Sequence, residues 1–104
     1  MKQFIVIAYD AKDAGAYERR LAARKAHVDS ITALRTEGKV ICGVAITDEN
    51  DRMIGSTVIT NFASRAEFDA WYAAEPYVVN NVWGDVKVLT GQIGPSFADL
   101  IKKA

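Results

Sequence analysis

The sequence has little of what marks several large classes of protein. Cys42 is the only cysteine, so the chain can form neither an internal disulfide nor a cluster of thiolate metal ligands. No apolar run approaches the ~20 residues that a membrane-spanning helix needs. There are also no internal repeats or low-complexity tracts. These absences exclude disulfide-rich scaffolds, repeat arrays and helical membrane proteins.

The chain also has no excess of positive or negative charge. Thirteen lysine and arginine residues balance thirteen aspartate and glutamate residues. Nucleic-acid-binding domains normally carry a basic patch or stripe. The one local basic group, made of Arg19, Arg20, Arg24 and Lys25, is too short to supply it. We therefore expect neither nucleic acid nor a membrane as a partner.

What is present is the composition of an ordinary globular domain, half hydrophobic and one quarter charged. The length predicts a single domain over residues 1–104. A domain of this size buries only part of its surface when it folds alone, so self-association would help it. The apolar run at residues 4–8 is too short for the core of a secretory signal, which predicts a cytoplasmic protein.

The distribution of apolar residues predicts four strands and two main helices. Strands are expected over residues 2–9, 39–47, 53–61 and 85–92, and helices over residues 16–37 and 64–75. Gly38 is placed to end the first helix, and Ser64 with Glu67 forms a capping box for the second. A short docking helix is expected in the tail, residues 94–104.

The order βαββαβ is typical of the ferredoxin-like α+β fold, a four-stranded antiparallel sheet with both helices on one face. The strands carry apolar residues on both faces, although the helices can cover only one. A second copy of the chain is the simplest cover for the other face, so we predict a homodimer. Cys42, in the middle of a strand, is expected to be an inert buried thiol.

Two polar residues interrupt the apolar stripe predicted for the first helix. At ~100° per residue, Arg24 projects between Tyr17 and Val28, and His27 lies at the edge of the same stripe. A guanidinium and an imidazole that face a sheet need partners. They are either structural, with the Arg24 stem covering the core, or part of a functional site. Spacing alone favours the structural interpretation.

Glu75 is the strongest candidate for a carboxylate partner of His27. It ends the second helix directly before Pro76 and Tyr77, and the two helices of this fold lie side by side. A carboxylate beside an imidazole would fix its tautomer and hold the ring for proton transfer. A solvated glutamate at a helix end is the alternative interpretation.

A glycine and a serine inside a strand form a second candidate feature. Gly55 permits close approach of a ligand or of another backbone, and the Ser56 hydroxyl can hydrogen-bond. No G-x-S-x-G pattern surrounds Ser56, so we do not interpret it as a nucleophile. With one histidine and no carboxylate cluster, we expect no structural metal site.

Four stretches of the chain together resemble the YciI-like, or YCII-related, family. They are ERRLAARKAH at residues 18–27, EGKVICG at 37–43, GSTVI at 55–59 and AWYAAEPYV at 70–78. The resemblance covers essentially the whole chain. It implies a ferredoxin-like fold that pairs into a dimeric α+β barrel, related to muconolactone isomerase.

The resemblance also implies a site. In the family, a histidine of the first helix pairs with the aspartate of an Asp-Pro-Tyr motif, near a Gly-Ser strand. Carried over to this chain, the catalytic residues are His27 and Glu75, and the substrate-binding residues are Arg24, Ser56 and Tyr77. Glu75 departs from the family, which usually has aspartate. Its carboxylate is displaced by about one methylene, and catalytic geometry is sensitive at the ångström scale.

Two functions follow from this pattern. The first is a cofactor-free lyase or isomerase acting on a small aromatic or enolisable molecule. His27 would act as general acid or base, with Arg24 and Ser56 steadying an oxyanion or a substrate carboxylate. The second is a non-catalytic dimeric module that binds a metabolite or a partner, and a cofactor-free monooxygenase is a weaker third. The family's clear enzymatic relative is a dehydrochlorinase of a chlorinated hydroxyhydroquinone, but fold kinship alone does not transfer an activity.

Overall fold

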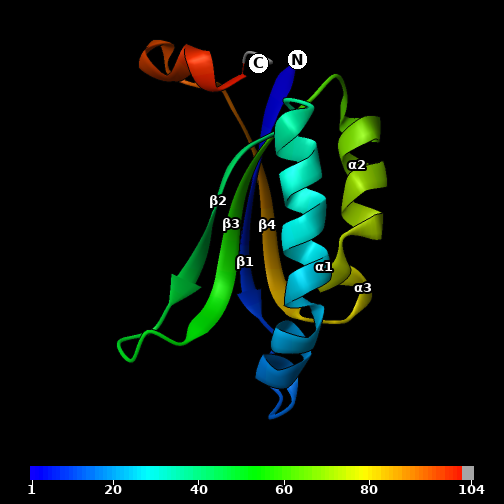
Figure 1. Ribbon diagram of the computed structural model, residues 1–104, viewed down its shortest axis with the longest axis vertical. Coiled ribbons are helices and arrows are strands. Elements are labelled where there is room, and N and C mark those ends of the chain that lie inside the picture. Colours follow the sequence, from blue (N-terminus) through cyan, green and yellow to red (C-terminus); the bar gives the residue numbers. More distant parts are fainter. Residues whose placement is uncertain (102–104) are drawn as a thin grey trace.

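The computed structural model describes residues 1–101 and shows one layer of helices packed against one sheet (Figure 1). In chain order the elements are β1 Lys2–Asp10, α1 Ala16–Thr36, β2 Val40–Thr47, β3 Met53–Phe62, α2 Arg65–Ala74, α3 Pro76–Val79, β4 Trp83–Gly91 and the 3₁₀ helix η1 Pro95–Ile101. The predicted end of the docking helix, residues 102–104, lies outside the described residues.

The sheet has the strand order β2-β3-β1-β4, and every neighbouring pair is antiparallel. Its register places Ile5 of β1 opposite Ile59 of β3 and Leu89 of β4. The helices α1, α2 and α3 all lie on one face (Figure 1). The predicted ferredoxin-like α+β fold is confirmed.

The helix ends follow local signals in the sequence. Gly38, directly after α1, has a φ of 76°, a conformation that glycine adopts without steric cost. The Ser64 hydroxyl caps α2 by accepting a hydrogen bond from the Glu67 amide at 3.2 Å. The helix α3, a single turn that begins at Pro76, was not predicted, because so short a helix has no apolar periodicity.

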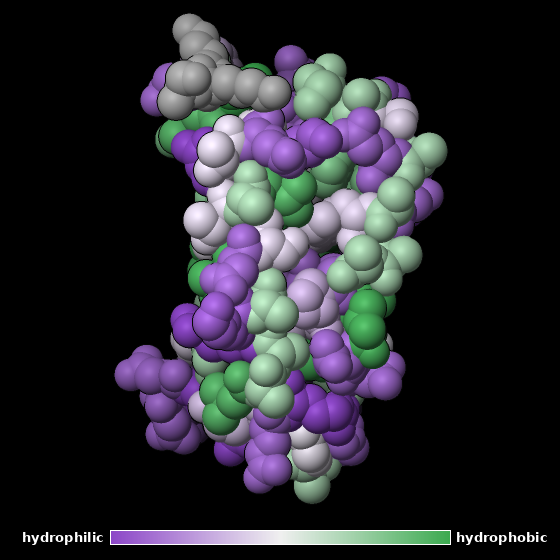
Figure 2. Space-filling view, turned by 45° about the vertical axis from the view of Figure 1, so that its right-hand side comes forward, coloured by the Kyte–Doolittle hydropathy of each residue, from purple (hydrophilic) through white to green (hydrophobic). Residues whose placement is uncertain are grey.

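The core fills the space between the sheet and the helices. Four of its aromatic members are almost fully buried: Phe4, Phe62, Phe68 and Tyr77. The rings of Phe4 and Phe68 lie 4.9 Å apart, joining β1 to α2. On the outer surface of the helical side, hydrophilic and hydrophobic residues are intermixed (Figure 2).

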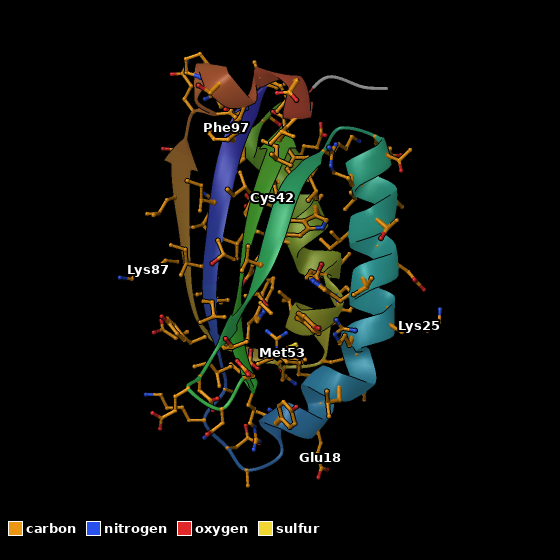
Figure 3. All side chains as sticks on the ribbon, turned by 60° about the vertical axis from the view of Figure 1, so that its left-hand side comes forward. Glu18, Lys25, Cys42, Met53, Lys87 and Phe97 are labelled. Atoms are coloured by element: carbon orange, nitrogen blue, oxygen red, sulfur yellow. The ribbon has the colours of Figure 1, made fainter. Side chains whose placement is uncertain are left out.

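The other face of the sheet carries exposed apolar side chains. Tyr9, Val44 and Leu89 are 47%, 63% and 48% exposed. Cys42 is also exposed, so the prediction of a buried thiol was wrong. The reason is the register: Cys42 lies on the edge strand β2 opposite Ile59, on the face that no helix covers. Figure 3 shows Lys87 of β4 pointing away from the helices.

The tail forms η1 beside the end of the sheet, close to the N-terminus (Figure 1). Leu100 and Ile101 are half-buried, but Phe97 is 57% exposed. In the single chain the tail therefore docks only its last turn. None of the helices within residues 1–101 is long and apolar enough to cross a membrane.

Candidate functional site

The face that α1 turns toward the sheet differs from the one predicted. Its buried residues are Ala16, Arg20 and Ala23, whereas Leu21 and Arg24 are exposed. The buried face is rotated by one residue, because Arg20 finds its hydrogen-bond partners on the sheet, at Asp10, Gly55 and Ser56. The prediction that Arg24 lies in the middle of the inward-facing stripe was therefore wrong, and Arg20 takes that place.

Arg20 is 2% exposed and is satisfied by three groups from the sheet. Its Nε donates to Oδ2 of Asp10 at 2.8 Å, forming a salt bridge with the end of β1. Its Nη2 donates to the carbonyl of Gly55 at 2.6 Å and to Oγ of Ser56 at 2.5 Å. Such charge-assisted hydrogen bonds stabilise a buried guanidinium that would otherwise be costly.

Gly55 is explained by the backbone and not by a ligand. A Cβ at this position would lie 2.4 Å from the carbonyl oxygen of Ala8 on β1. Of the two interpretations of Gly55, the structure supports close approach of a neighbouring strand. This close packing holds the following residue, Ser56, against the Arg20 guanidinium.

His27 contacts Glu75, which lies at the junction of α2 and α3. Nδ1 of the imidazole faces Oε1 of the carboxylate, which also accepts a hydrogen bond from the Tyr77 amide at 3.3 Å. Glu75 is 1% exposed, and within residues 1–101 its Oε2 has no partner. The interpretation of Glu75 as a solvated helix-end residue was wrong, and the longer side chain still reaches the imidazole.

The ring of Tyr77 forms a wall between the two polar pairs. It stacks on the His27 imidazole with the ring centres 4.0 Å apart and lies 4.6 Å from the Arg20 guanidinium carbon. Burial raises the pKa of the Tyr77 hydroxyl above its ordinary value, and the charges of Arg20 and Arg24 oppose this rise. The phenol therefore stays protonated at neutral pH.

A cavity of about 230 Å³ opens beside these groups, between α1 and the strands β2 and β3. Four of the five predicted site residues line it: Arg24, His27, Ser56 and Tyr77. Glu75 lies behind His27 and does not line the cavity. Met53, labelled in Figure 3, is part of the same lining, which is otherwise largely apolar.

Arg20, Asp10 and Trp83 were not predicted from the sequence as part of the site. Trp83 donates from Nε1 to the Ser56 hydroxyl at 3.1 Å. The available signal for Arg20 was its helical spacing with Ala16 and Ala23. In the part of the chain that the structure describes, no three His, Cys, Asp or Glu side chains gather closely enough to hold a metal ion.

The family of the chain is decided by a comparison with known protein families. The YCII-related domain matches residues 2–91. The chain belongs to this family. Among its relatives is Protein YciI of Escherichia coli O6:H1 (strain CFT073), 34% identical over 91 residues that cover 82% of this chain and 91% of the relative.

Solved structures place this YCII-related chain among ferredoxin-like folds. The 5-chloro-2-hydroxyhydroquinone dehydrochlorinase of Burkholderia phenoliruptrix AC1100, in complex with 2,5-dihydroxybenzoquinone, superposes with a TM-score of 0.74 at 21% identity, covering 90% of this chain and 97% of that one. A dimeric ferredoxin-like protein of unknown function from Jannaschia sp. CCS1 gives a TM-score of 0.51 at 14% identity, covering 89% and 100%. At these identities the likeness shows the fold.

The raised pKa of Tyr77 predicts how stability changes in alkali. A group whose pKa is higher in the folded chain contributes stability below the unfolded value of ~10, and that contribution is lost as pH rises through the folded value. Tyr77→Phe should therefore lose stability less steeply above pH ~10, by at most about 1.4 kcal/mol per pH unit. Urea unfolding from pH 7 to 11.5 measures this. The difference between wild type and variant should be constant below pH ~9, and identical alkaline slopes would contradict the prediction.

Proposed function

We propose that this YCII-related chain is a small-molecule enzyme whose chemistry is acid–base catalysis at His27, of the lyase or isomerase type. Such a reaction moves a proton within the substrate or eliminates a proton with a leaving group, so it needs no cofactor. The observation that carries the proposal is the contact of His27 with a buried carboxylate at the wall of a cavity. Perturbed or paired titratable groups that line a cavity are typical of catalytic sites.

The contact of His27 with Glu75 gives the two nitrogens of the imidazole ring different functions. When Glu75 is ionised, Nδ1–H donates to Oε1, which leaves the lone pair of Nε2 free to take a proton from a substrate. Glu75 then stabilises the imidazolium that forms, because its carboxylate is buried and held by the Tyr77 amide. In this proposal Glu75 is the orienting partner and His27 the group that exchanges protons.

The substrate-binding residues of this proposal are Arg24, Ser56 and Tyr77. The cavity lies between a helix and a sheet, which favours a flat substrate, and Arg24 and Ser56 supply polar contacts for an oxygen of the substrate. The dehydrochlorinase of similar fold, in complex with a dihydroxybenzoquinone, supports a small aromatic or quinonoid molecule. A metabolite-binding module without catalysis is the competing function.

The test measures proton transfer and chloride release with two compounds of this class. The protein is incubated with 5-chloro-2-hydroxyhydroquinone to follow chloride release, and with 2,5-dihydroxybenzoquinone in D₂O to follow exchange of ring hydrogens by NMR. We expect the wild type to accelerate at least one of these reactions. His27→Gln should reduce the accelerated rate by about 10²–10⁴-fold, the usual contribution of a positioned acid or base.

The matched control is Lys25→Gln, which alters the same helix at a side chain that is 88% exposed. Its rate should equal that of the wild type. Glu75→Gln should lower the rate while the compound still binds. Saturable binding of either compound without exchange or chloride release, in wild type as in His27→Gln, would contradict catalysis and favour the binding module.

We also propose that the chain works as a homodimer in the cytoplasm. The open face of the sheet, defined by Ile5, Ile7, Tyr9, Val44, Ile59 and Leu89, carries the exposed apolar side chains of β1, β2 and β4. A second copy packed on this face would bury them, and a ferredoxin-like neighbour is itself dimeric. The free Cys42 thiol is consistent with a reducing compartment.

A further inference from the structure

The hydroxyl of Ser56 has both of its acceptor positions occupied. Oγ accepts one hydrogen bond from Arg20 Nη2 at 2.5 Å and a second from Trp83 Nε1 at 3.1 Å. A serine hydroxyl has two lone pairs and one proton. Since both lone pairs are used, the group can offer a ligand only its proton. Among the described residues, none accepts that proton.

The donors that hold Ser56 in this state are themselves fixed. Arg20 is 2% exposed and is held by Asp10 and by the Gly55 carbonyl. Trp83 is 8% exposed. Neither donor can turn away without losing buried contacts, so Arg20 and Trp83 act as positioning residues. Ser56 therefore presents a hydrogen-bond donor to the cavity that it lines.

The charged side chains that line the cavity are all cationic. Arg20, Arg24 and His27 line it, and no aspartate or glutamate does. Asp10 neutralises Arg20, and Glu75 faces His27. Within residues 1–101, Arg24 makes no ion pair. Arg24 is therefore a cationic side chain at the rim of the cavity that no carboxylate of the described residues contacts.

The rest of the lining limits the size and shape of a ligand. Val28, Ile31 and Val58 contribute apolar surface, and Tyr77 is stacked against His27. The volume of about 230 Å³ lies below the range of ~300–1,000 Å³ that is usual for drug-sized ligands. Such a cavity suits a molecule of about one ring.

We propose that the cavity selects a small planar monoanion, whose charged oxygen accepts a hydrogen bond from Ser56 Oγ and pairs with Arg24. The anion is a carboxylate, phenolate or enolate of about one ring. This inference rests on the proposed site and names its substrate class. Ser56 excludes a ligand that presents only N–H donors at this point, and Arg24 favours a negative charge over a neutral oxygen.

Three probes of nearly equal shape separate charge from fit: benzoate, benzamide and benzamidinium carry charges of −1, 0 and +1. Their binding to the full chain is measured by titration of the ¹H–¹⁵N spectrum, following the amides of Gly43, Ser56 and Thr57. We expect benzoate to bind about tenfold more tightly than benzamide, because an ionised acceptor makes stronger hydrogen bonds. Benzamidinium should give no saturable shift at these amides.

Matched variants test which residues cause the preference for benzoate over benzamide. Arg24→Gln should bring the dissociation constants of benzoate and benzamide within about threefold of each other, because only the charge preference is lost. Lys25→Gln removes one positive charge from the adjacent, solvent-exposed position of the same helix and should keep the preference. Ser56→Cys, which substitutes a weak thiol donor at nearly constant volume, should weaken benzoate and benzamide together.

Three outcomes would overturn the inference: no binding of benzoate to the wild type, equal binding of benzoate and benzamidinium, or an unchanged preference in Arg24→Gln. Both Arg24 and Lys25 are exposed, so these variants should fold. None of the probes is a substrate, so the result does not depend on proton transfer. A wild type that shows no preference for benzoate but catalyses a His27-dependent reaction would refute this inference and leave the proposed function standing.

Discussion

Arg20→Met is expected to lower the free energy of unfolding by about 3–5 kcal/mol, the usual cost of removing one partner of a buried ion pair. Methionine keeps an unbranched apolar side chain but removes the charge. Asp10 would then be left beside the core without its counter-charge, and the Gly55 carbonyl would lose a donor. Urea unfolding followed by circular dichroism measures the change.

A double-mutant cycle identifies the cause of this loss. In Arg20→Met/Asp10→Asn the uncompensated carboxylate is gone, so the double variant should be more stable than Arg20→Met alone. The exposed ion pair of Lys25 and Asp29 gives a reference, because solvent screens it and its removal should change the free energy of unfolding far less. A cost below 1 kcal/mol for Arg20→Met would show that the buried network does not stabilise the fold.

Leu89→Asp is expected to convert the proposed dimer into monomers. Leu89 lies opposite Ile5 on the open face of the sheet, and a carboxylate there would be buried without a partner in the interface. A two-fold interface contains the change twice, and each copy of a buried anchor residue contributes about 2 kcal/mol. The dimer dissociation constant should therefore rise about a thousandfold. Light scattering over a range of protein concentrations measures it.

The chain provides a control of the same residue type and the same exposure. Leu21 on α1 is 48% exposed, as is Leu89, but it belongs to the helical layer. Leu21→Asp should leave the dimer unchanged, and both variants should keep the circular dichroism spectrum of the folded chain. A wild type that is monomeric at micromolar concentration, or a Leu89→Asp variant that stays dimeric, would refute the proposed interface.

The fold could be predicted because its signals are local. Strand boundaries, the glycine after α1 and the capping box of α2 each depend on a few neighbouring residues, and all are found close to their expected positions. The inward face of α1 could not be predicted in the same way. A helical wheel gives weight to large apolar residues, whereas this helix packs through Ala16 and Ala23, and pairs its buried arginine with a residue ten positions away.

The site could be predicted only because the resemblance to the YciI-like family indicated its residues. The positions of Glu75 and Ser56 near His27 depend on how three segments pack, and no local pattern encodes that packing. The direction of the Ser56 hydrogen bonds could not be predicted from the sequence for the same reason. Whether Ser56 accepts or donates depends on Arg20 and Trp83, which are 36 and 27 residues away in the chain.

The sequence separations within the site have a consequence for folding. His27 and Glu75 are 48 residues apart, and Arg20 and Ser56 are 36 apart. Closing such loops costs chain entropy before any contact is gained, so neither pair can form in an isolated helix or hairpin. The cavity thus appears only once α1, β3 and the junction of α2 and α3 have packed together. It is lost again with the first opening that separates α1 from the sheet, so the lifetime of the site is bounded by that opening and not by fraying of the helix ends.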